Sequence, residues 1–276
     1  MPSLFVVVVS LLFAALVMVV AAYFWLRHQQ RQLREHRRAG ISALRGLQIL
    51  LASLQQHRGL ANGYIHGEVA LHRSLLEVRD KVHSQITRIE AASDWVVDKA
   101  YWQSITESWA RILASFPQSD PDNSFRTHSA LIRNVLVLIG HTTERHKLPG
   151  VAAKNAMSYS FIWEKLLTTA ELMGQARGLG IGIAVDGECP ASARKQLAKL
   201  VAEIERESEQ LAGSLPNFEP VTPLVEEYLK TIDDKLLGSA PSIEPMEYFS
   251  VASVAIDALY QYYNEALREL QVQIYR

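Results

Sequence analysis

One short phrase occurs twice in this chain, each time near the end of a long stretch with helical periodicity. The first copy is RGLANG at residues 58–63. The second copy, RGLGIG at residues 177–182, follows about 120 residues later. A repeat at this separation predicts two related halves rather than one irregular domain.

Both arginines of the phrase fall on an apolar stripe. Residues at alternating three- and four-residue steps lead to Arg58 and to Arg177: Leu44, Leu47, Leu51 and Leu54 in the first copy, and Trp163, Leu166, Ala170 and Met173 in the second. An inward-facing guanidinium must be compensated, because an unpaired buried charge costs several kcal/mol. Two alternatives remain open: a salt bridge to Glu171 or Glu164, or convergence of the two cations on a bound anion.

Glycines recur every four residues beside each arginine. They are Gly59, Gly63 and Gly67 in the first half and Gly174, Gly178 and Gly182 in the second. Each costs roughly 1 kcal/mol relative to alanine inside a helix, so such a run needs a structural reason. Close approach of two helices, or of a small ligand to a helix, is that reason.

The residues around both phrases resemble the nitrate- and nitrite-sensing (NIT) domain family. The resemblance is carried by LQQHRGL at 54–60 with Gly63-Tyr64, by ELMGQARGL at 171–179, and by Tyr248-Phe249 with IDAL at 256–259. It covers most of residues 41–274. The family is an all-helical bacterial sensory module of two four-helix bundles, found attached to chemoreceptors, kinases, nucleotide cyclases and RNA-binding antiterminators.

The resemblance implies that Arg58 and Arg177 hold nitrate or nitrite. We expect their sequence neighbours Gly59, Gly178 and His57 to belong to the same ligand site. A guanidinium is planar and offers paired donors, which suits a small planar oxyanion. Some members carry paired basic residues where this chain has His57-Arg58. Some also carry a further arginine near the final helix, where residues 247–250 contain none.

The N-terminal residues 4–26 form an almost uninterrupted apolar run of about 23 residues, long enough to cross a hydrocarbon core of about 30 Å. No lysine or arginine precedes it, which argues against a cleaved signal peptide. Five arginines and one acid follow in residues 27–38. The positive-inside rule then predicts a bacterial inner-membrane protein with a cytoplasmic C-terminal part. A periplasmic bundle is the less favoured topology.

The predicted segments are an anchor at 1–26, a basic juxtamembrane segment at 27–40, a first bundle at 41–148 and a second bundle at 149–276. Helices are expected at about 41–65, 69–92, 95–116 and 125–147, and then at 151–184, 190–211, 224–237 and 245–276. The first helix could continue back through the basic segment toward the membrane, or Gly40 could interrupt it. No stretch alternates with period two, so the expected fold class is all-α.

Several other function classes are disfavoured by the sequence. The nine histidines are scattered and the His-Glu-x-x-His signature is absent, so we expect no metal site, no cofactor and no enzyme. The charge is near neutral, with 28 basic and 29 acidic residues, which argues against nucleic-acid binding. Cys189 is the single cysteine, consistent with a reducing compartment.

We therefore expect a single transmembrane helix followed by two tandem four-helix bundles. The expected function is to bind nitrate or nitrite between two arginines. The chain ends at Arg276 without an output domain, so the signal is expected to pass to a separate, unidentified protein; a homodimer is also plausible. The alternative is a membrane-tethered helical scaffold that binds a protein partner and senses nothing, with both arginines paired to internal carboxylates.

Overall fold

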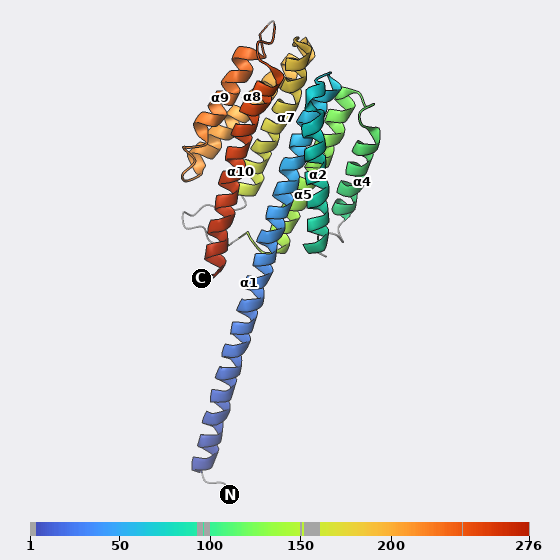
Figure 1. Cartoon of the computed structure of the whole chain (residues 1–276). Helices are drawn as coiled ribbons and strands as arrows, with labels where there is room; N and C mark the ends of the chain where they lie inside the picture. Colours follow the sequence, from blue (N-terminus) through green and yellow to red (C-terminus); the bar gives the residue numbers. More distant parts are fainter. Residues whose placement is uncertain are drawn as a thin grey trace.

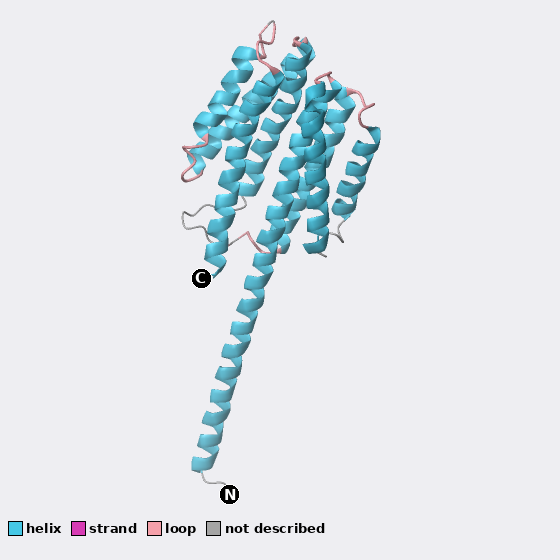
Figure 2. Cartoon of the chain, in the orientation of Figure 1, coloured by secondary structure: helices cyan, strands magenta, loops and turns pink. Residues whose placement is uncertain are grey.

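The computed structural model describes residues 4–92, 96, 100–149, 151, 161–238 and 240–275. Within these ranges the chain forms eight α-helices and no strand, as Figures 1 and 2 show. The helices lie roughly side by side, and the N-terminal part of the first helix projects far beyond the others (Figure 1). The all-α prediction is confirmed.

Helix α1 (Leu4–Ile65) is a single element of 62 residues. Its side chains from residue 7 to residue 26 are exposed, and it is the one helix in the described part of the chain long and apolar enough to cross a membrane. Gly40 does not interrupt it. A Cβ atom at Gly40 would collide with the side chain of His146, so this glycine permits close packing instead of ending the helix.

The first four-helix group consists of α1 with α2 (His72–Ala92), α4 (Ala100–Ser115) and α5 (Pro121–Arg145). Helix α1 packs against α2 and α5, and α4 packs against α5. A short 3₁₀ turn, Val69–Leu71, comes before α2 where the sequence predicted the helix itself. Helix α5 begins at Pro121 rather than at Phe125, because Asp120 caps it by accepting the Asn123 N–H at 2.9 Å.

Helix α4 carries two buried tryptophans, Trp102 and Trp109, which lie seven residues apart. The start of the third expected helix, at about residue 95, lies outside the described residues.

The second group consists of α7 (Leu167–Asp186), α8 (Ala191–Ser214), α9 (Thr222–Lys235) and α10 (Pro245–Tyr275). A π-helical turn, Ile162–Leu166, leads into α7, and the rest of the helix expected from residue 151 falls largely on residues that are not described. Helix α7 packs against α8 and α10, and α9 packs against α10. This repeats the arrangement of the first group, with α7 in the place of α1 and α10 in the place of α5.

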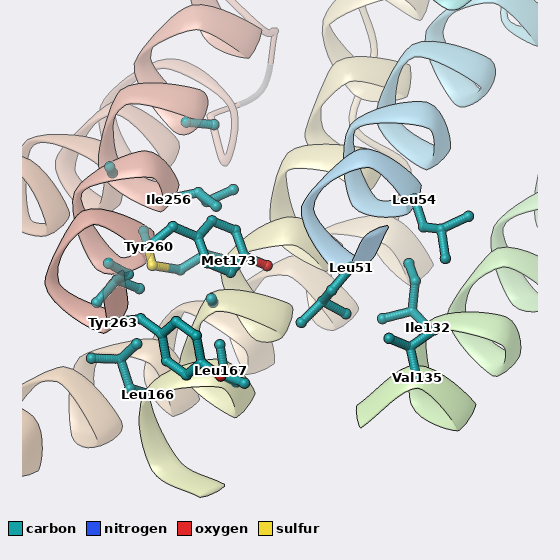
Figure 3. Close-up of a cluster of buried hydrophobic side chains, with 14 of the residues drawn as sticks. Leu51, Leu54, Ile132, Val135, Leu166, Leu167, Met173, Ile256, Tyr260 and Tyr263 are labelled. Carbon is teal, nitrogen blue, oxygen red and sulfur yellow. The ribbon is translucent and has the colours of Figure 1, made fainter. Parts of the chain in front are cut away.

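One apolar core runs through both groups, and Figure 3 shows part of it. Leu51 and Leu54 of α1 face Ile132 and Val135 of α5, and all four are at most 1% exposed. In the second group the core joins α7 and its preceding turn to α10 through Leu166, Leu167, Met173, Ile256, Tyr260 and Tyr263. The two groups meet mainly through α1 and α7, which carry the two arginine phrases.

The basic segment of α1 contacts the C-terminal ends of two other helices. His36 Nε2 lies 2.8 Å from the Arg145 carbonyl oxygen at the end of α5, and Arg37 Nε donates to the Lys147 carbonyl at 3.2 Å. The Arg38 guanidinium lies 3.8 Å from the ring centre of Tyr275 in α10. One continuous helix therefore links the apolar N-terminal segment to the first arginine phrase.

Candidate functional site

Arg58 of α1 is 1% exposed, and its side chain lies across the surface of α7. A Cβ atom at Gly174 would lie 3.0 Å from Arg58 Nη2, and one at Gly178 would lie 3.6 Å from Arg58 Nε. These two glycines therefore make the room that the guanidinium fills. The periodicity argument that placed Arg58 in the interior agrees with this position.

The Arg58 guanidinium binds Glu171 of α7 with both Nη atoms. The Nη1–Oε1 distance is 2.6 Å and the Nη2–Oε2 distance is 3.2 Å, and Nη1 also donates to Ser129 Oγ at 2.9 Å. The Nε2 atoms of Gln55 and Gln175 donate to the same carboxylate at 2.7 and 2.9 Å. Of the two carboxylates considered, the partner is Glu171. Of the two alternatives left open by the sequence, the salt bridge is therefore present for Arg58.

Arg177 of α7 is 3% exposed. Its side chain lies against α1, as the Arg58 side chain lies against α7. Its Nη1 donates to Ser253 Oγ at 2.9 Å, its guanidinium sits 4.7 Å from the centre of the Phe249 ring, and its Nε would lie 3.6 Å from a Cβ at Gly59. Among the described residues it forms no ion pair with an aspartate or glutamate. Burial lowers the pKa of Arg177, and the charge of Arg58 lowers it further.

The surroundings of the two arginines repeat one another. Arg58 contacts Phe125 and Ser129 of α5, and Arg177 contacts Phe249 and Ser253 of α10; each phenylalanine precedes its serine by four residues. The Phe125 ring also lies against Gly178, as the Phe249 ring lies against Gly59. The site therefore has approximate twofold symmetry. The symmetry is broken at Glu171, because the equivalent position of α1 is Ala52.

Both arginines keep one donor unused. The Nε atoms of Arg58 and Arg177 are buried and have no hydrogen-bond partner among the described residues. Each lies next to a glycine of the opposite helix, Gly178 and Gly59 respectively. A buried N–H without an acceptor costs about 1–3 kcal/mol, so each of these two donors would be stabilised by a small acceptor between α1 and α7.

His57 lies elsewhere. Its ring is buried inside the first group, in edge-to-face contact with Trp109, and its Nδ1 is 2.9 Å from Nε2 of His128. His128 Nδ1 lies 2.7 Å from the Ser124 carbonyl oxygen, so His128 donates there and accepts from His57 Nδ1–H. The structure thus brings together Arg58, Arg177, Gly59 and Gly178 but directs His57 away from them.

The histidine pair makes stability depend on pH. Burial lowers the pKa of His128 from 6.5 to about 4, and burial also lowers the pKa of His57. Between these pH values the unfolded chain takes up a proton that the folded chain does not, so stability is complete above about pH 6.5 and is lost as the pH falls towards 4. His128→Gln should flatten this dependence of the urea midpoint.

The exposed His141 provides the control for the pH experiment, because His141→Gln should leave the wild-type dependence intact. Carboxylates titrate in the same range, so the comparison is between variants rather than between pH values alone. Identical pH profiles for His128→Gln and the wild type would contradict the assignment of neutral, buried imidazoles.

A hollow of about 680 Å³ lies beside the site, at the end of the helices away from the N-terminus of α1. Its lining includes Asn62, Phe125 and Leu179, and also His66 and Asp186, whose Nδ1 and Oδ1 atoms are 2.8 Å apart. The Phe125 ring, 5.2 Å from the Arg58 guanidinium carbon, separates the hollow from the buried arginine. The hollow lies where the C-terminal ends of α1 and α7 face the start of α5.

Four residues of the site escaped the sequence reasoning. Phe125, Ser129, Phe249 and Ser253 complete the two arginine environments, and they form a second repeated pattern, Phe-x-x-x-Ser, near the start of α5 and α10. A search for phrases that recur in both halves with different intervening residues would have found it. Glu171 was considered a salt-bridge partner but not a member of a ligand site.

Comparison with known proteins identifies the family. The sequence model of a family described as nitrate and nitrite sensing matches residues 50–271. The chain belongs to the nitrate and nitrite sensing (NIT) family. The NIT region includes both arginine phrases and most of both helix groups, and no curated protein matches the chain.

A solved structure is also similar in fold. It is that of the NasR transcription antiterminator, with a TM-score of 0.65 over 93% of this chain and 74% of that chain. The two sequences are 17% identical, so this likeness shows the fold of the chain but does not identify its ligand residues.

Proposed function

We propose that this NIT protein is a membrane-anchored sensor that binds nitrate or nitrite between Arg58 and Arg177 and signals to a separate protein. The proposal is supported by membership of a nitrate and nitrite sensing family and by the position of both arginine phrases inside the matched region. In this proposal, Gly59 and Gly178 leave the space in which the anion and the guanidinium groups approach the helix backbones.

The observation that carries the proposal is the pair of buried Nε–H donors without acceptors, one on each arginine. Nitrate offers three oxygen acceptors in one plane and no donor, so it could accept from both Nε atoms at once. A hydrogen bond to a charged group contributes about 1.5–3 kcal/mol, and the low dielectric of the buried site strengthens it. A neutral ligand would leave the charge of Arg177 uncompensated.

The effect of binding would pass along α1. Arg58 lies on the same unbroken helix as the apolar segment, and the basic stretch of that helix is held by the C-terminal ends of α5 and α10. An anion that binds one arrangement of α1 and α7 more tightly than another shifts the population between the two. We propose that a partner protein contacts the bundle or the membrane segment and responds to this change in population.

The proposed location is the bacterial inner membrane, with the helical groups in the cytoplasm. The exposed apolar residues of α1 support a single membrane span. The arginines that follow the span support the orientation, because cytoplasmic flanks carry an excess of Lys and Arg.

One observation favours the scaffold alternative. Arg58 is paired with an internal carboxylate, Glu171, which is what a structural arginine needs. Arg177 is the residue that separates the two functions, because a scaffold predicts a carboxylate partner for it as well, and it has none among the described residues. The sensor is therefore the better supported function.

Thermal unfolding of the chain in a mild detergent tests the proposal. Nitrate at about a hundredfold excess over its dissociation constant should stabilise the folded state by roughly 2.7 kcal/mol, which raises the Tm by about 5–10 °C. Chloride at the same ionic strength serves as the control. Equal Tm values in nitrate, nitrite and chloride would contradict the proposed ligand.

A further inference from the structure

The buried ionisable groups at the site add up to a single positive charge. Arg58 and Arg177 contribute two cations. Glu171 contributes an anion, since four N–H donors from Arg58, Gln55 and Gln175 reach its two oxygens and none of its contacts could accept a carboxyl proton. The sum is therefore +1 before any ligand binds.

The other titratable groups that face the site leave this sum unchanged. Burial raises the pKa of Tyr228, Tyr248 and Tyr260, which surround Arg177 and Gln55, so these phenols are neutral. Burial lowers the pKa of His57 and His128, on the α5 side of Arg58, so these imidazoles are neutral as well.

Asp257 of α10 is the remaining acid near Arg177. It is exposed and makes no ion pair with Arg177; partial burial raises its pKa, and the charge of Arg177 acts in the opposite direction. Water and salt screen an exposed carboxylate, so it compensates the buried guanidinium weakly.

We infer that Glu171 sets the charge of the ligand: it leaves the site with one uncompensated positive charge, so that the site takes singly charged anions and excludes doubly charged ones. The inference rests on the proposed anion site and names its selectivity. A monoanion brings the buried group of charges to zero. A dianion of similar size, such as sulfate, would leave one uncompensated negative charge in a buried site. Burial of such a charge is strongly unfavourable.

The broken symmetry of the site supports this role. Arg58 and Arg177 have equivalent phenylalanine and serine neighbours, and the Nε of each lies beside a glycine of the opposite helix. Only the first arginine receives a carboxylate, because residue 171 is glutamate while the equivalent residue 52 is alanine. Two carboxylates would leave the site neutral, and none would leave it at +2.

The test measures the Tm of the full chain in detergent at increasing concentrations of nitrate or of sulfate, at constant ionic strength. The two anions are compared by the concentration that gives half of the maximal rise in Tm. The wild type should respond to nitrate and not to sulfate. Glu171→Gln keeps the size and part of the hydrogen bonding but raises the site to +2. It should respond to sulfate and lower the nitrate-to-sulfate preference by about tenfold or more.

Glu164→Gln is the matched control, because it adds the same charge to the chain at an exposed position two turns earlier. It should keep the wild-type preference. Circular dichroism checks that each variant is folded. Should Glu171→Gln fail to fold, Ala52→Glu supplies the opposite change, bringing a second carboxylate to the side of Arg177 and the sum to zero. It should lose the nitrate response, while Ala52→Gln keeps it.

The outcomes separate this inference from the proposed function. A nitrate response in the wild type with the same anion preference in folded Glu171→Gln, or with nitrate binding retained in Ala52→Glu, would overturn the role of Glu171 alone. A wild type that ignores nitrate while Glu171→Gln binds sulfate would contradict the proposed ligand and support Glu171 as the determinant of charge. No anion response in either protein would overturn both.

Discussion

Arg177→Met is expected to abolish the nitrate-induced rise in Tm and to leave the anion-free protein at least as stable as the wild type. Arg177 is buried without a carboxylate partner, and its Nε has no acceptor among the described residues. Methionine fills a similar volume without a charge to desolvate. Ser253 loses a donor but stays hydrogen-bonded, because its Oγ also donates to the Phe249 carbonyl at 2.7 Å.

The control for this experiment is Arg133→Met, at an exposed position of α5. It should retain the full nitrate response and the wild-type Tm. If Arg177→Met still responded to nitrate with the wild-type half-saturation, the second arginine would have no part in binding. If it instead lost several kcal/mol of stability without ligand, Arg177 would have a structural role that this account does not give it.

Arg58→Met is expected to give the opposite stability result, a loss of about 3–5 kcal/mol in the free energy of unfolding. The substitution leaves the Glu171 carboxylate buried with amide donors but no cation. Urea unfolding in detergent measures the loss. The same variant should lose the nitrate response, because one of the two anion donors is gone.

The double variant Arg58→Met with Glu171→Leu distinguishes a broken ion pair from a simple packing defect. Removing the stranded carboxylate should recover much of the lost stability, since replacing a whole buried pair with apolar residues is often close to neutral. Additive losses in the double variant, or a loss below about 1 kcal/mol in Arg58→Met alone, would contradict a strong buried pair between these residues.

The interior position of both arginines was predictable because helical periodicity is a local property. The stripe that ends at Arg58 contains Leu47, Leu51 and Leu54, and a residue on that stripe must face the core wherever the helix packs. The repeated phrase also indicated two related halves. The all-α class followed from the same periodicity and the lack of alternating segments.

The pairing of Arg58 with Glu171 was open from the sequence, because it depends on which turns of α1 and α7 lie side by side. Glu164 lies on the same helical stretch, seven residues earlier, and periodicity alone does not choose between the two acids. The contact of Gly174 and Gly178 with the Arg58 side chain fixes the choice, since it places Glu171 next to the guanidinium.

The continuity of α1 was also open, because Gly40 has two opposite uses. A glycine favours a helix end where the backbone turns, and it favours close packing where another element approaches. His146 is that element, more than a hundred residues away in the sequence. The displacement of His57 from the site has a similar origin, since its neighbours Trp109 and His128 come from α4 and α5.

A structure of the full chain determined in the presence of nitrate tests the central claim most directly. We expect a planar anion between α1 and α7, with oxygen atoms about 2.7–3.2 Å from Nε of both Arg58 and Arg177, and with Glu171 still bound to Arg58. An anion held at another place, or both Nε atoms left without an acceptor at a nitrate concentration that raises the Tm, would show that the two arginines are not the binding site.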